Sequence, residues 1–110
     1  MTKNFKTGYI NNGKINYKML EEPVNQLKVL AHPVRFAIVI ILASNHKMTV
    51  TEIYEELSIQ QAATSNHLKL MKTLDILNSH RVGKNTYYSV NNETMLKLFN
   101  VLRLDDAELN

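Results

Sequence analysis

The sequence of 110 residues contains no cysteine, which excludes disulfide bonds, thiolate metal sites and a dithiol redox switch. It also has no run of the roughly 18 apolar residues that a membrane-spanning helix needs. The longest apolar run, 36–43, is short enough to predict a buried helix. The N-terminal residues lack the apolar core of a signal peptide. Together these absences predict a cytoplasmic protein that crosses no membrane.

Patterns typical of enzymes and metal sites are missing as well. The sequence offers no nucleophile–base pair, no paired carboxylates and no glycine-rich phosphate loop. The four histidines lie in four different predicted elements, without the spacing of metal ligands; they are His32, His46, His67 and His80. We therefore expect no catalytic site, no metal ion and no cofactor.

The net charge of +3 is unevenly distributed along the chain. Between residues 59 and 90 the acidic Asp75 stands against four basic residues, Lys69, Lys72, Arg81 and Lys84. A surface that faces phosphate groups has this character, but an uneven solvated face has it too.

The length predicts a single domain. We expect a flexible N-terminal arm over 1–14, a folded part over 15–104 and a frayed tail over 105–110. Within the arm, Asn12-Gly13 would alternatively turn a small hairpin.

Apolar residues at helical spacing predict three helices in the first half of the chain. The first covers about 15–30, where Pro23 either opens a second helical piece or kinks one long helix. The second begins at Pro33 and carries apolar residues on nearly all faces, so we expect it to be central and buried. The third is short and begins with a capping box, in which Thr49 is the N-cap and Glu52 lies three residues on.

A turn of three residues, 58–60, separates this short helix from the next one, which is the helix-turn-helix arrangement. The inward face of the next helix carries Thr64, Leu68, Met71 and Leu74, and its outward face carries Gln61, Ala62, Ser65, Asn66 and Lys69. Gln60 is a poor N-cap. Ser58 with Gln61 would make a capping box of its own and start the helix earlier. Two strands over 77–81 and 86–90, and a last helix from 93 to about 104, complete the chain.

Three segments carry a resemblance to a known family: LKVLAHPVRFAIVIIL, LSIQQAATSNHLKLM and RVGKNTYYSV. They are similar, in the same order and in unbroken register over about 26–90, to the LxxLAHPxRLxIL, LxLSQSTVSxHLxxL and RREGRxxYYxL signatures of the ArsR/SmtB family of winged-helix regulators. The resemblance implies a mainly α fold with a small β-hairpin, a winged helix-turn-helix of about five helices and a two-stranded wing. It also implies a homodimeric repressor that binds a palindromic operator in double-stranded DNA. The family dimerises through its first and last helices, which here carry Leu20, Val24, Leu27, Met95, Phe99 and Leu102.

The first part of the second helix of a helix-turn-helix enters the major groove, where amides match the edge of adenine. Gln61 and Asn66 are therefore the predicted base readers. Ser65 and Gln60 are expected to bond a phosphate or a base, and Lys69 a phosphate. The wing residues Arg81 and Lys84 would lie at a minor groove, although a solvated hairpin tip would also carry them.

What controls DNA binding stays open at this point. The cysteine sites of metal-sensing relatives are absent, and the last helix has no histidine, so we expect no response to metal. A small molecule, a protein partner or the concentration of the chain could be the signal. Tyr9, Tyr17 and Met19 could line a pocket for such an effector, or simply pack in the core. The alternative function is a winged-helix protein-interaction module without DNA binding.

Overall fold

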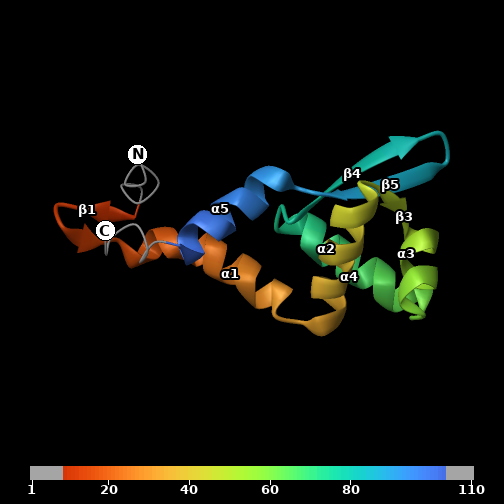
Figure 1. Cartoon of the computed structure of the whole chain (residues 1–110), viewed down its shortest axis with the longest axis horizontal. Coiled ribbons are helices and arrows are strands. Elements are labelled where there is room, and N and C mark those ends of the chain that lie inside the picture. The colour runs from red at the N-terminus through yellow and green to blue at the C-terminus, as the bar shows by residue number, and fades with distance from the viewer. Residues whose placement is uncertain (1–8, 104–110) are drawn as a thin grey trace.

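The computed structural model describes residues 9–103. The predicted tail over 105–110 and the first eight residues of the predicted arm lie outside the described residues. The elements in chain order are β1 (Ile10–Asn11), β2 (Lys14–Ile15), the 3-10 helix η1 (Tyr17–Leu20), α1 (Glu21–Leu30), α2 (Pro33–Asn45), β3 (Met48–Thr49), α3 (Val50–Leu57), α4 (Gln61–Thr73), β4 (Leu77–Val82), β5 (Asn85–Val90) and α5 (Asn92–Leu102). Figure 1 shows β1 and α5 at one end of an elongated molecule, with α3 and the strands β4 and β5 toward the other.

A small hairpin joins β1 and β2, in the register Ile10↔Ile15. Its turn residues, Asn12 and Gly13, both have positive φ, 55° and 76°. Two positive φ values in succession match the twist of a two-residue hairpin, which Asn-Gly adopts at little cost. Residues 10–15 thus form the hairpin that was the alternative to a flexible arm. The flexibility of the arm stays a prediction.

The first helix begins later than its apolar stripe predicts. The side-chain oxygen of Asn16 accepts a hydrogen bond from the Lys18 backbone N–H, and this cap starts η1 rather than an α-helix. The chain then continues directly into α1. Pro23 lies in the first turn of α1, where its missing N–H leaves no helical hydrogen bond unmade. α1 begins at Glu21, two residues before Pro23, so the prediction that Pro23 opens a second helical piece is wrong by two positions.

The core is built where α2, α3, α4 and the strands meet, and its fully buried side chains include Ile38, Leu42, Ile53, Leu68, Met71 and Ile76. The prediction that α2 is buried on nearly all faces is wrong. Phe36 and Ile40 are each 53% exposed. They lie four residues apart on one side of α2, and the described part of the chain lays no other element over that side. Periodicity alone could not locate this side, because apolar residues surround the whole helix.

The wing has one more strand than expected. Its sheet has the order β3-β5-β4, all antiparallel. The third strand, β3, pairs Met48 with Tyr88 and leads directly into α3. This pairing fastens the wing to the N-terminus of α3 and so fixes where the wing stands relative to the helix-turn-helix.

Within residues 9–103, no single helix has the length and apolar character to cross a membrane. The pair 17–30 and 33–45 passes such a test jointly, on length and composition alone, but it is bent by 94°. Its second member contributes Ile38 and Leu42 to the core just described.

Candidate DNA-reading interface

Local hydrogen bonds set the geometry of the two helices of the helix-turn-helix. The predicted capping box is confirmed: the Thr49 hydroxyl accepts from the Glu52 N–H, and the Glu52 carboxylate accepts from the Thr49 N–H at 2.8 Å. At the other end of α3, Ser58 adopts a left-handed conformation, with φ 55°, and the Ile59 N–H donates to the Tyr54 carbonyl.

Ser58 therefore ends α3 and does not cap α4, so the alternative of an earlier start is wrong. α4 begins at Gln61, and Gln60 occupies the N-cap without a side-chain hydrogen bond. The first turn is held instead by Thr64, whose buried hydroxyl donates to the Gln60 carbonyl at 2.9 Å. An uncapped first turn leaves backbone N–H groups free to meet an anion at this end of the helix.

The two faces of α4 separate as their spacing predicts. Thr64, Leu68 and Met71 are buried, and Leu74 is partly buried. The predicted reading residues on the other side are all exposed: Gln60, Gln61, Ser65, Asn66 and Lys69. Short side chains at 62–65 let a partner approach the backbone of this face closely.

The wing tip is shaped by a hydrogen bond of its own. The Arg81 Nε–H donates to the Gly83 carbonyl at 3.1 Å, and Gly83 turns the chain with φ 62°. Both Arg81 and Lys84 are exposed. The Lys47 ammonium, just before β3, lies 5.1 Å from the centre of the Tyr87 ring on β5, which is a cation–π contact.

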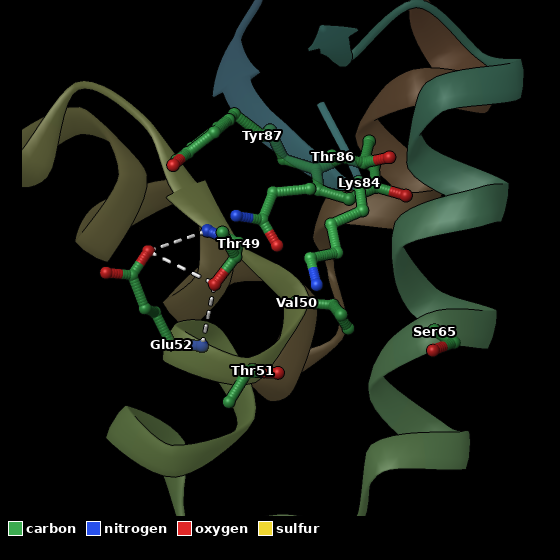
Figure 2. A pocket seen from close by; sticks show the side chains of 10 residues that line it. Thr49, Val50, Thr51, Glu52, Ser65, Lys84, Thr86 and Tyr87 are labelled. Carbon is green, nitrogen blue, oxygen red and sulfur yellow. Dashed lines mark hydrogen bonds between the residues drawn. The ribbon is translucent and has the colours of Figure 1, made fainter. Parts of the chain in front are cut away.

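A groove of about 590 Å³ connects the wing with the helix-turn-helix. Figure 2 shows Lys84 extending from the wing toward the first turn of α3, with Ser65 facing the same space from α4. Thr49, at the end of β3, and Thr51, in the first turn of α3, also line it. Asn85 and Thr86 also line it, and sequence reasoning missed both; their only signal was their place beside the basic wing tip.

The middle of α4 is joined to α2 by a cluster of basic side chains. The Arg35 Nε–H donates to His67 Nδ1 at 3.2 Å, and the His67 and His32 rings lie 5.0 Å apart. His32 in turn caps α2, because its Nδ1 accepts from the Val34 N–H. Burial lowers the pKa of His67 below its usual value, and the charges of Arg35 and His32 lower it further. His67 is therefore held neutral, as an acceptor for Arg35.

The predicted dimer residues fall into two groups. Val24, Phe99 and Leu102 are exposed, whereas Leu20, Leu27 and Met95 are partly buried, with Met95 packed against the core. Leu96, which the apolar stripe did not single out, is 59% exposed. Tyr17 and Met19 are also largely exposed, so neither packs in the core, and neither lines the cavity described next.

A polar cavity of about 310 Å³ lies between α1, the end of α4 and the start of α5, lined by Glu22, Gln26, Asp75, Asn91, Glu93, Thr94 and Lys97. No group of three or more His, Asp or Glu residues stands in metal-holding proximity anywhere in residues 9–103.

An exposed, amide-bearing helix in a helix-turn-helix, flanked by a basic wing, defines the winged helix-turn-helix class of nucleic-acid-binding proteins. Comparison with known proteins agrees. A family model described as a helix-turn-helix domain matches residues 30–80. The transcriptional repressor PagR of Bacillus anthracis is 38% identical over 93 residues, which are 82% of this chain and 93% of that protein. The transcriptional repressor SdpR of Bacillus subtilis is 33% identical over 67 residues, covering 61% of this chain and 73% of SdpR.

Solved structures give the same fold. The crystal structure of PagR superposes with a TM-score of 0.67 at 34% identity, over 79% of this chain and 98% of that one. An ArsR-like transcriptional regulator from Rhodococcus sp. RHA1 superposes with a TM-score of 0.73 at 18% identity, over 84% of this chain and 86% of that one, a likeness of fold alone. The chain belongs to the ArsR/SmtB family of transcriptional regulators, which are DNA-binding proteins and not enzymes.

Proposed function

We propose that this chain is a homodimeric repressor that binds a palindromic operator, without a metal ion in its regulation. The observation that carries the proposal is the exposed face of α4. The side chains of Gln61 and Asn66 are exposed to solvent. They lie on the same helix as Ser65, which lines the groove into which the wing extends Lys84.

The chemistry of this face suits the edges of bases. An amide donates and accepts at once, as adenine does at N6 and N7, and a good bidentate pair discriminates against the wrong base by about 1–3 kcal/mol. Ser65 and Lys69 lie beside these amides with their side chains exposed, in reach of the phosphates that flank a major groove. Arg81 and Lys84 extend the basic surface along the wing, where an adjacent minor groove would pass.

Two features of the shape support a dimer. The radius of gyration is 16.3 Å, against about 13 Å for a compact domain of this length. The elements that lengthen the molecule, here called the apolar arms, are η1 and α5. They carry exposed apolar side chains, among them Tyr17 at 70% and Leu102 at 64%. Burying one such side chain contributes about 1.5–3 kcal/mol, so two copies that cover each other's arms would be strongly favoured. The same two-fold axis would present two copies of α4 to two half-sites.

A selection from random DNA duplexes, read by sequencing, tests the proposal. We expect a palindrome whose half-sites lie about one helical turn apart, and an affinity whose log–log salt slope is about −0.9 for each phosphate neutralised. A single or asymmetric half-site would contradict the two-fold dimer. Failure to select any duplex at low salt would instead favour the protein-interaction module.

Once the operator is known, Asn66→Ala should cost about 1–3 kcal/mol on it and little on random DNA, because a base contact is lost. Lys69→Ala is the matched control from the same face. Removing one phosphate contact from each protomer should weaken binding to both DNAs alike and reduce the salt slope by about 1.8. If Asn66→Ala weakened both DNAs equally, Asn66 would not be a base reader.

A further inference from the structure

Gln26 is a polar side chain that lies buried inside the molecule, only 5% exposed, at a position where α1 meets the end of α4. Its Nε2–H donates to the backbone carbonyl of Leu74 at 2.8 Å. The two residues are 48 positions apart in the sequence, so this bond is a tertiary tie and not part of either helix. A buried amide that donates a hydrogen bond to a carbonyl restrains the position of that carbonyl, because breaking the bond would leave both groups unsatisfied.

The carbonyl it holds belongs to the C-cap of α4. Two earlier carbonyls are satisfied locally, because the Asp75 N–H donates to the Lys72 carbonyl and the Ile76 N–H donates to the Met71 carbonyl. This is the Schellman arrangement, with Asp75 in the left-handed conformation at φ 60°. The Leu74 carbonyl is one of the terminal groups that a helix cannot satisfy itself, and Gln26 satisfies it.

The bond joins two helices that otherwise meet only through the shared core, where Val29 of α1 packs in one cluster with Leu68 and Met71 of α4. α1 packs mainly against η1, α2 and α5, the part that carries the exposed apolar arms, whereas α4 packs mainly against α3 and β4. In Figure 1, α1 runs from the end that holds β1 and α5 toward the helix-turn-helix. Gln26 therefore connects the helix proposed to form the dimer with the helix proposed to read DNA.

We propose that Gln26 is a positioning residue that sets the angle of α4 relative to α1, and through it the spacing of half-sites that the dimer accepts. The proposal rests on the proposed function. The reading residue Gln61 lies 13 residues from Leu74, about 20 Å along the helix, so a rotation of about 10° at Leu74 moves Gln61 by about 3.5 Å, close to the rise of one base pair. Loss of the Gln26 bond at the C-terminal end of α4 would thus change its register on DNA, even though the Arg35–His67 bond still holds the middle of the helix.

The first test replaces Gln26 by Met, which has a similar length but no donor. Binding is measured on operators with the native half-site spacing and with spacings one or two base pairs shorter or longer. The wild type should prefer the native spacing by more than about tenfold, because a wrong spacing costs at least one base contact. Gln26→Met should lose at least about tenfold on the native spacing and little on the others, which flattens the preference. Asn25→Met, on the exposed side of the same helix, is the matched control and should keep it.

The second test measures the angle itself. Since the chain has no cysteine, Ala62→Cys introduces one spin label in each protomer, on the exposed face of α4. The label-to-label distance distribution in the dimer should be narrow with Gln26 and broad with Gln26→Met. Gln26→Leu, which also lacks a donor, should broaden it as well and serves if the Met variant does not fold.

Equal weakening by Gln26→Met at every spacing, or an unchanged distance distribution, would overturn the positioning role. If the wild type selects no duplex, it is the proposed function that fails, and that outcome is visible before any variant is made.

Discussion

The side chain of His67 links α4 to α2, and this link depends on its protonation state. It lies on α4, accepts from Arg35 on α2, and stands 5.0 Å from the His32 ring that follows α1. Burial is the main cause of the lowered pKa of His67, because it disfavours the charged imidazolium, and the basic groups Arg35 and His32 lower the pKa further. Protonation of Nδ1 would turn the acceptor into a donor and break the bond to Arg35.

This arrangement makes folding stability depend on pH. Because the folded-state pKa of His67 lies below its ordinary value of 6.5, the unfolded chain binds more protons in that range, and stability falls as the pH drops below about 6.5. We expect the wild type to lose more unfolding free energy between pH 7.5 and 5.5 than His67→Gln, which cannot be charged. Urea unfolding at the two pH values measures this difference. His80→Gln, an exposed wing histidine, should behave as the wild type does; equal losses in all three proteins would remove His67 as the cause.

At the level of the helix, the ends of α4 are the parts furthest from ideal. Its N-cap side chain makes no hydrogen bond, and its C-terminal turn places Asp75 in the left-handed conformation. An L-residue pays for that conformation, and a negative charge at a helix C-terminus opposes the helix dipole. The first end is where the proposed DNA contact lies, and the second is where Gln26 bonds the Leu74 carbonyl.

Asp75→Asn should therefore stabilise the fold by about 0.5–1 kcal/mol, because Asn tolerates the left-handed conformation better and carries no charge. The measurement is the urea unfolding free energy at pH 7.5. Glu93→Gln offers a contrast of opposite sign. Glu93 lies in the first turn of α5, where its charge favours the dipole, and its loss should cost about 0.3–1 kcal/mol. A destabilised Asp75→Asn would mean that its carboxylate has a favourable role at the polar cavity it lines.

At the scale of the whole molecule, the elongated shape and its exposed apolar end favour association with a second copy. The extents are 50 × 22 × 21 Å, and α5 at one end exposes Leu96, Phe99 and Leu102. The Arg103 guanidinium lies 5.2 Å from the centre of the Phe99 ring, which is still 53% exposed. Such a row of apolar side chains on a projecting helix is typical of a surface that packs on a second copy.

Phe99→Glu should weaken the proposed dimer by at least about 2 kcal/mol, the size of an interface hot spot, and sedimentation equilibrium measures the shift toward monomer. Phe36→Glu is a closely matched control, because Phe36 has the same exposure, 53%, and lies on α2 rather than α5. We expect the Phe36 variant to remain dimeric. Dissociation by Phe36→Glu but not by Phe99→Glu would move the interface to α2.

Much of the fold follows from signals that act over a few residues. The Thr49–Glu52 box, the Pro33 start and the spacing of Thr64, Leu68 and Met71 are local, because caps, φ restrictions and helical periodicity each involve neighbours within about four positions. These signals were enough to order the elements, to divide α4 into a buried and an exposed face, and to identify the family.

Other features depend on which elements meet in space. The exposed side of α2 at Phe36 and Ile40, the pairing of Met48 with Tyr88 and the bond from Gln26 to Leu74 all join or separate residues distant in sequence. No local pattern distinguishes a Gln on the surface from one that satisfies a carbonyl 48 residues away. The exposed face of α4 could therefore be predicted from the order of amino acids. The contacts that orient this helix are visible only once the chain has packed, because burial and hydrogen bonding across elements are properties of the assembled core.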